Sequence, residues 1–326
     1  YQGAGSSLIN PIKLDSAYDT LKEMGADFTF AAGYTLKGKN KKANEMVAEA
    51  VNNAKNADVA LVFVGLTDDY ETEGNDRSHI NLPPIHNTLV EEVLKVNPNT
   101  IVVLSGGASV TMPWADKVPA ILNMFLTGQA GGSAVCDIIF GDVNPSGKLA
   151  ETYPIALEDN SSYNFFPGTS VSVEYRESVY VGYKYYDTAK KEVAFPFGHG
   201  LSYTTFEYSD VKVSSDKIKD TDTVTVSFKI KNTGAVDGAE VAQIYVNDVE
   251  STIYRPVKEL RAFKKVFLKA GEEKDVQIEL NKRSFAFYNV NIHDWHVESG
   301  EYKILVGASS REIILTDTVK ITSSTV

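Results

Sequence analysis

The hydrophobic and polar positions follow two different patterns along the chain. In residues 1–204, short continuous apolar runs alternate with longer stretches of helical periodicity. A continuous apolar run is typical of a parallel strand that is covered on both faces, and three runs fit this pattern: Asp58–Gly65, 100–104 and 120–125. Apolar side chains at spacings of three and four predict an amphipathic helix over 43–56. This alternation predicts an α/β domain with an open, mostly parallel sheet flanked by helices.

From Thr205 onward the pattern has a period of two. Residues 223–230 alternate apolar and polar side chains and then reach the turn residues Asn232-Thr233-Gly234. Short strands at this spacing predict an all-β sandwich of immunoglobulin or fibronectin type III character. The sequence therefore divides into an α/β domain at 1–204 and a sandwich at 205–326.

The amino-acid composition argues against some classes of function. The 326 residues suit two domains, and 43 acidic against 32 basic side chains give a net charge of −11. An acidic chain is a poor partner for phosphate backbones, so we expect no nucleic-acid binding. No apolar run reaches the roughly 20 residues of a membrane-spanning helix, so we expect no membrane partner. The single cysteine, Cys136, cannot form an internal disulfide and is predicted to be a small core residue.

The densest polar cluster is the segment Thr67–Arg77, directly after the first predicted strand. Functional groups of open α/β sheets gather beyond the carboxyl ends of the strands. Several carboxyl groups in one loop allow a raised pKa, which a general acid needs near neutral pH. The alternative is a solvated acidic loop that leads to a helix starting near Asn81 or Pro83-Pro84.

Two other segments are weaker candidates. Gly128–Gly132 could be a nucleotide loop, but its spacing is not G-x-G-x-x-G, so a tight strand-to-helix turn is favoured. His293 and His296 flank Asp294-Trp295, but this spacing in a β-rich stretch is weak as a metal pattern, and Trp295 is expected to cover the sandwich core. We expect no metal and no organic cofactor.

Several motifs together resemble glycoside hydrolase family 3, the β-glucosidase family. They are the segments Tyr1-Gln2-Gly3-Ala4-Gly5-Ser6-Ser7, Glu73-Gly74-Asn75-Asp76-Arg77 with Leu82-Pro83, 140–149, 181–186 and 195–203. The downstream part is similar to the family's fibronectin type III-like domain. The resemblance implies the family's α/β sandwich, followed by that module.

The resemblance also implies a retaining mechanism with two carboxyl groups about 5–5.5 Å apart. It makes Glu73 the acid/base residue. Glu71 is the rival, because side chains two residues apart in an extended loop could face the same way. Arg77 is expected to be a substrate-binding residue and to order the loop by pairing with Asp76 or a neighbouring carboxylate. Ser6 is expected to contact the sugar.

The family's nucleophile is an Asp on a TIM barrel that precedes this region, so the resemblance implies a barrel portion as partner and an inactive chain by itself. The first strand of the α/β domain is also expected before Tyr1.

The implied substrate is a β-glucoside or oligosaccharide with a terminal non-reducing β-D-glucosyl residue. A β-xylosidase or related exo-glycosidase, and a non-catalytic carbohydrate-binding or scaffold protein, stay open as alternatives, as does a homo-oligomer. The resemblance to bacterial intracellular-type members implies a cytoplasmic location, with secretion as the alternative.

Overall fold

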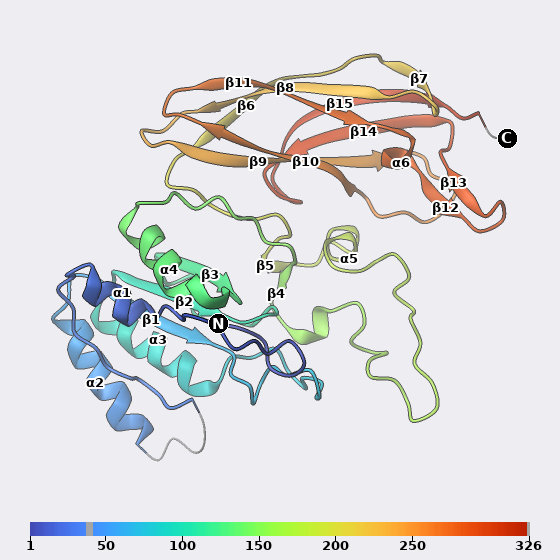
Figure 1. The fold of residues 1–326 in the computed structure, drawn as a ribbon. Helices are drawn as coiled ribbons and strands as arrows, with labels where there is room; N and C mark the ends of the chain where they lie inside the picture. Colours follow the sequence, from blue (N-terminus) through green and yellow to red (C-terminus); the bar gives the residue numbers. More distant parts are fainter. Residues whose placement is uncertain (37–41, 325–326) are drawn as a thin grey trace. The chain divides into compact units, whose positions relative to one another are not determined.

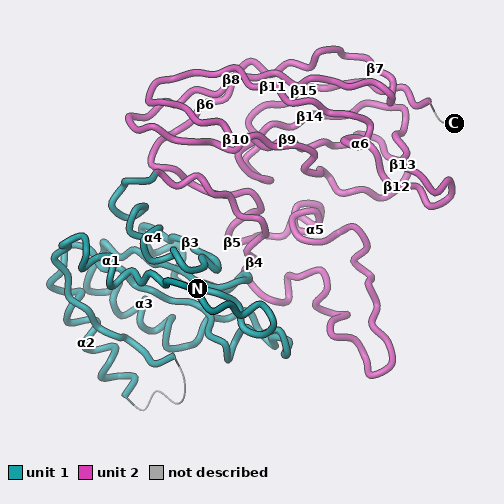
Figure 2. The backbone as a smooth tube through the Cα atoms, in the orientation of Figure 1, with its two compact units in different colours: residues 1–143 teal, residues 144–326 magenta. Residues whose placement is uncertain are grey.

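A computed structural model describes residues 1–36 and 42–324. The chain forms two compact units, Tyr1–Val143 and Asn144–Val326, which Figure 2 shows in different colours. Each unit is described by itself.

The first unit is built on three parallel strands in the order β1-β2-β3. Figure 1 shows the helices as two pairs, α1 with α4 and α2 with α3. The strands are β1 (Ala60–Gly65), β2 (Thr100–Ser105) and β3 (Ala120–Phe125). The helices are α1 (Ala17–Glu23), α2 (Ala43–Lys55), α3 (Pro84–Val96) and α4 (Gly131–Phe140), with a 3-10 turn, η1 (Gly128–Ala130), before α4. The predicted α/β architecture with a parallel sheet is confirmed.

The central strand β2 explains why the apolar runs are continuous. Val102 and Val103 are both buried although they point to opposite faces of the sheet. Val103 packs in one cluster with Leu21 of α1 and Val135 of α4, and α3 contacts β1 and β2. The edge strand β1 is less well covered, since Phe63 keeps 38% of its surface exposed. The expectation that β1 is buried on both faces is therefore wrong at this residue.

Local signals fix the helix ends. The helix α3 begins at Pro84, where a missing N–H costs nothing because the first turn leaves that donor unpaired. Asn97 ends the helix, and its side chain donates to the carbonyls of Ala54 and Ala57 at 3.0 and 2.9 Å, so α2 and α3 end against each other. The helix start predicted near Pro83-Pro84 is confirmed.

The glycines before α4 serve close packing. A Cβ on Gly132 would lie 2.4 Å from the backbone carbon of Ser16, and one on Gly131 would lie 1.8 Å from Oγ1 of Thr127. Only glycine lets the start of α4 approach the start of α1 so closely. The tight-turn interpretation of Gly128–Gly132 therefore has a structural reason.

The second unit contains the sandwich. One sheet has the order β10-β9-β14-β15-β7 and the other β11-β8-β6. The strands are β6 (Phe206–Val213), β7 (Lys217–Lys219), β8 (Val224–Asn232), β9 (Gly238–Asp248), β10 (Glu259–Leu268), β11 (Glu273–Leu280), β14 (Gly300–Gly307) and β15 (Ile313–Thr322). A short helix α6 (Lys282–Phe285) and a hairpin of β12 (Phe287–Asn289) and β13 (Asp294–His296) lie between β11 and β14.

Alternation produces the sandwich core as the sequence predicts. Along β8, Val224, Val226, Phe228 and Ile230 are buried and the residues between them are half-buried. They share one apolar cluster with Ile244 and Ile304 of the facing sheet. Trp295 packs against this cluster, which confirms the prediction that it covers the core.

The segment 144–204 holds β4 (Tyr153–Pro154), a 3-10 turn η2 (Leu157–Asp159), α5 (Tyr183–Thr188) and β5 (Val193–Phe195). Polar contacts join it to the sandwich strands. Lys148 pairs with the buried Glu240 of β9 at 3.1 Å, and its own side chain is 12% exposed. Gln243 donates to the carbonyl oxygens of Gly198 and Ala308 at 3.0 and 2.7 Å. These contacts place 144–204 in the same compact unit as the sandwich, whereas the sequence pattern groups it with the α/β part.

Candidate functional site

The candidate site lies in the first unit, in the loop that follows β1. Its start is fixed to the neighbouring strand, since the backbone N–H of Leu66 donates to the carbonyl of Ser105 at 3.0 Å. Farther on, Thr72 bridges to Ala4 of the N-terminal segment and to Asn75. The second bridge closes a tight turn with Glu73-Gly74 at its tip. The loop therefore presents Glu73 on an exposed corner while its base is tied to two other segments.

Glu73 is held by Ser6. The backbone N–H of Ser6 donates to Oε2 of Glu73 at 2.6 Å, across 67 residues of sequence. The Ser6 hydroxyl and this N–H both stabilise the charged form, and they lower the pKa of Glu73 below its ordinary value. The structure thus brings together two of the residues that the sequence singled out, Glu73 and Ser6.

Glycine makes this contact sterically feasible. Gly5 has φ +97°, and a Cβ there would lie 2.6 Å from Cβ and 2.7 Å from Oε2 of Glu73. Any side chain at this position would overlap the glutamate. The first segment of the chain is therefore shaped to receive Glu73.

Glu71 has a different partner. Its Oε2 accepts the backbone N–H of Gly107 at 2.8 Å, in the segment that follows β2. A Cβ on Gly107 would lie 2.8 Å from the Glu71 carboxylate, so this glycine also makes room for an acid. Glu71 thus ties the loop after β1 to the loop after β2, as expected where the carboxyl ends of parallel strands meet.

Glu71 and Glu73 would face the same way in an extended chain, but the chain turns at Glu73-Gly74. The turn closed by Thr72 and Asn75 interrupts the alternation of side chains at Glu73. The two carboxylates reach different backbone donors instead. Arg77 is half-buried in the same loop, and its pairing with Asp76 or a neighbouring carboxylate stays a prediction.

A buried histidine supports the carboxyl end of β1. His86 of α3 is 2% exposed, and its Nδ1 accepts the backbone N–H of Gly65 at 3.3 Å. Burial lowers its pKa to about 4, so the ring is neutral. The ring of Tyr34 lies 3.9 Å from it, and the Tyr34 hydroxyl donates to the carbonyl of Phe63. His86 is thus part of the support under the loop.

Other candidates from the sequence have structural roles. Asp294-Trp295-His296 is a strand of the β12–β13 hairpin, and Cys136 is buried in α4. Within residues 1–36 and 42–324, no three His, Cys, Asp or Glu side chains are grouped so that they could hold a metal ion. In the same described ranges, no helix has both the length and the apolar character needed to cross a membrane.

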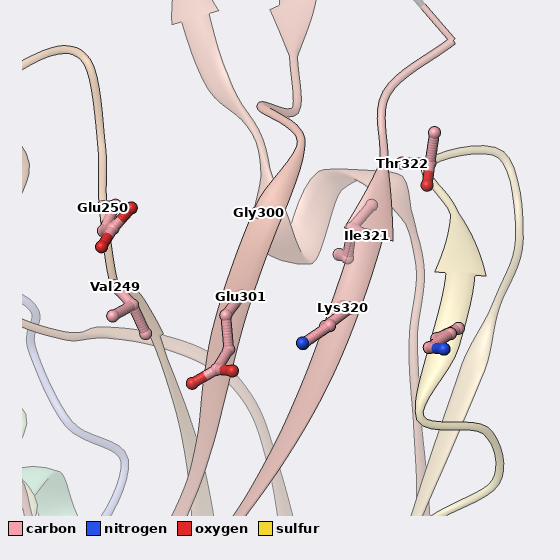
Figure 3. Close-up of a pocket in the computed structure, with 8 residues that line it drawn as sticks. Val249, Glu250, Gly300, Glu301, Lys320, Ile321 and Thr322 are labelled. Atoms are coloured by element: carbon pink, nitrogen blue, oxygen red, sulfur yellow. The ribbon is translucent and has the colours of Figure 1, made fainter.

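The second unit has a hollow of about 550 Å³ on its larger sheet, shown in Figure 3. It is lined by β7, β14, β15 and the segment after β9. Glu301 lies opposite Lys320 in the strand register, and Lys320 lies opposite Lys217. Glu301 and Lys320 carry opposite charges, whereas Lys320 and Lys217 carry the same charge. Both lysines are exposed, which is typical of a solvated sheet face. None of the sequence-predicted site residues lines it.

Sequence reasoning missed the two glycines that position the carboxylates. The sequence indicates Gly5 only as part of the Tyr1–Ser7 motif, and it gives no role to Gly107. The available signal is a glycine pair directly after a predicted strand, which permits close backbone approach. The glutamate that packs against each glycine lies far away in the sequence, so the spacing of residues alone could not identify the pair.

Comparisons with known proteins agree with these observations. The model described as "Glycosyl hydrolase family 3 C-terminal domain" matches residues 1–203, and a fibronectin type III-like domain matches 240–310. Thermostable β-glucosidase B of Acetivibrio thermocellus is 51% identical over 99% of this chain, which spans 43% of that protein. An exo-α-(1→6)-L-arabinopyranosidase of Bifidobacterium breve is 48% identical over 98% of the chain and 42% of its own length.

Solved structures match nearly the whole chain as well. The GH3 β-glucosidase of Bifidobacterium adolescentis matches 98% of this chain and 47% of its own at 45% identity, with a TM-score of 0.93. β-Glucosidase 3B of Thermotoga neapolitana in complex with glycerol matches 98% of this chain and 48% of its own at 35% identity, with a TM-score of 0.87. The chain thus spans less than half the length of these relatives.

Proposed function

Because the chain belongs to glycoside hydrolase family 3, we propose that it carries the acid/base carboxylate of a retaining β-glucosidase and that Glu73 is this group. The substrate is a β-glucoside, cleaved at its terminal non-reducing β-D-glucosyl residue. One observation carries the proposal: the loop after β1 presents Glu73 at the exposed tip of a tight turn while Ser6 fixes its carboxylate.

The two steps of a retaining reaction need two protonation states of this carboxyl group. It first protonates the leaving glycosidic oxygen, and then takes a proton from the water that attacks the glycosyl-enzyme. The Ser6 donors stabilise the charged form, which is the form needed for the second step. The first step needs a raised pKa, which a bound glycoside supplies when it excludes water from the carboxyl group. In this proposal Ser6 assists the base step through its contact with Glu73, and it also contacts the sugar.

Glu71 supports the loop in this proposal and does not transfer the proton. Its carboxylate accepts the Gly107 N–H and fastens the loop to the end of β2. A group that leaves this contact to protonate the substrate would release the loop that positions Glu73. The acid/base role and the fastening role are thus divided between the two glutamates.

The nucleophile is proposed to come from a barrel portion outside this chain. The direct test is a chimaera in which this chain replaces its counterpart in the Acetivibrio β-glucosidase. The chimaera should hydrolyse an aryl β-glucoside, and residues 1–326 alone should not. Hydrolysis by the purified chain alone would show that it contains its own nucleophile.

Azide separates the two glutamates. In the chimaera, Glu73→Ala should keep activity on a substrate with a good leaving group when azide is added, because azide intercepts the glycosyl-enzyme without a base. The product should be β-glucosyl azide. Glu71→Ala should lose activity that azide does not restore. The opposite pattern would assign the acid/base role to Glu71.

A second activity is supported by two relatives, 48% and 47% identical, that are named exo-α-(1→6)-L-arabinopyranosidases. The chimaera should therefore be assayed on aryl α-L-arabinopyranoside and aryl β-xyloside beside the β-glucoside. A higher kcat/KM on either pentoside would move the proposal to that sugar. No turnover of any of them, in a folded chimaera, would favour a non-catalytic carbohydrate-binding role.

A further inference from the structure

A smaller hollow in the second unit lies between the β12–β13 hairpin and the loop after β9. Its volume is about 300 Å³, at the lower end of the range for small-molecule sites. Its lining combines aromatic, amide, hydroxyl and carboxylate groups from two segments: Thr252, Ile253, Phe287–Asn291, His296 and Glu298. No residue of the proposed catalytic loop contributes to it.

The hairpin register explains how the ring of Phe287 becomes free to line the hollow. Tyr288 lies opposite Trp295, whose ring packs against the sandwich core. Phe287 lies opposite His296, and side chains alternate between the faces of a strand pair. Phe287 and His296 therefore lie on the face away from Trp295. An aromatic ring is thus left half-buried at the hollow and outside the core.

The walls of the hollow are held in place. Glu298, 9% exposed, accepts hydrogen bonds from the Ser251 hydroxyl at 2.9 Å and from the Thr252 N–H at 3.1 Å. The guanidinium of Arg255 lies over the Phe287 ring, 5.8 Å from its centroid. Arg255 is in turn paired with Asp248 and buried. The loop and the aromatic ring are therefore positioned before any ligand arrives, which lowers the cost of binding.

The hairpin turn adds amide groups to the hollow. The side-chain oxygen of Asn289 accepts the backbone N–H of Asn291 at 2.9 Å. This bond fixes the Asn289 side chain within the turn, and Asn291 is exposed beside it. Two amides can then offer donors and acceptors to hydroxyl groups of a ligand.

From this arrangement we infer that the hollow is a binding site for an uncharged saccharide of one or two pyranose rings. An aromatic ring beside amides and a hydroxyl suits a ligand with an apolar ring face and hydroxyl edges. The Glu298 carboxylate and the net charge of −11 disfavour an anion. The site is separate from Glu73, so the inference does not depend on the proposed activity.

The test is an NMR titration of residues 1–326 with cellobiose, because amide shifts report where the sugar binds. The amides of Thr252, Asn289 and Asn291 should shift and saturate. Phe287→Leu keeps apolar bulk but removes the aromatic face, and should weaken binding by up to about tenfold. Asn291→Ala should weaken it severalfold. Tyr254→Ala is the matched control, since it removes a 94% exposed aromatic ring from the same loop, outside the hollow.

Two results would overturn the inference. One is a titration in which these amides do not move up to the solubility limit of cellobiose. The other is an affinity for cellobiose that is the same in the wild type, in Asn291→Ala and in a folded Phe287→Leu variant. If Phe287→Leu does not fold, Asn291→Ala decides alone. Because no hydrolysis is measured, this experiment can fail while Glu73 retains its proposed role, and the reverse also holds.

Discussion

Replacing Gly5 by alanine tests how the first segment of the chain controls Glu73. The added Cβ would lie 2.6 Å from Cβ of Glu73 and 2.7 Å from its Oε2. The backbone at Gly5 has φ +97°, which an L side chain rarely adopts. Gly5→Ala should therefore displace either the segment around Ser6 or the tip of the turn, and separate Ser6 from Glu73.

The size of the effect follows from the backbone alone. A left-handed conformation costs an alanine about 1–2 kcal/mol, which changes the ratio of two conformations by about 5- to 30-fold. The steric overlap adds to this cost. The conformation in which Ser6 contacts Glu73 should thus become the minor one, and activity in the chimaera should fall by about tenfold.

A carboxyl ¹³C NMR titration of Glu73 measures the contact without any activity. In the wild-type chain the Ser6 donors hold the pKa of Glu73 below its ordinary value of 4.5. In Gly5→Ala the pKa should rise toward that value because the donors are withdrawn. Gly74→Ala is the control, since nothing lies within 4 Å of a Cβ there. An unchanged Glu73 titration in folded Gly5→Ala would refute the reasoning.

Three further predictions concern stability. His86 binds a proton in the unfolded chain below pH 6.5 but in the folded chain only near pH 4. The free energy of unfolding should therefore fall by about 3 kcal/mol from pH 6.5 to 4. Urea unfolding measured at several pH values should show a weaker pH dependence of this free energy in His86→Gln. Gln243→Leu leaves the Gly198 and Ala308 carbonyls without their donor and should cost at least about 2 kcal/mol in urea unfolding. Ile244→Ala should cost about 2–5 kcal/mol in the same assay, whereas Ile314→Ala, at a 41% exposed site, should change stability by less than about 1 kcal/mol.

The outcomes that would contradict these predictions are specific. A pH dependence that His86→Gln leaves unchanged would assign the acid sensitivity to other groups. A neutral Gln243→Leu would mean that the carbonyls find new donors. Equal effects of Ile244→Ala and Ile314→Ala would contradict the placement of the sandwich core.

The sequence by itself determined the elements and their class. Period-two and helical patterns depend on neighbouring residues, so the sequence predicts β8 and α2 nearly to their ends and the start of α3. The start of α3 at Pro84 and the turn before α4 follow from local backbone chemistry. The loop with Glu73 was found for the same reason, since it follows directly on an apolar strand.

Only the tertiary structure decided what the loop residues touch. Ser6 and Glu73 are 67 residues apart, and Glu71 and Gly107 are 36 apart, so no local pattern contains either contact. An extended chain would let both glutamates face the same way, but the turn closed by Thr72 and Asn75 lies at Glu73, and the two carboxylates accept from different backbone donors. Side-chain direction in a loop depends on the backbone that distant segments impose. The sequence therefore identified the acids, whereas the N-terminal segment gave Glu73 its partner and the segment after β2 gave Glu71 its partner.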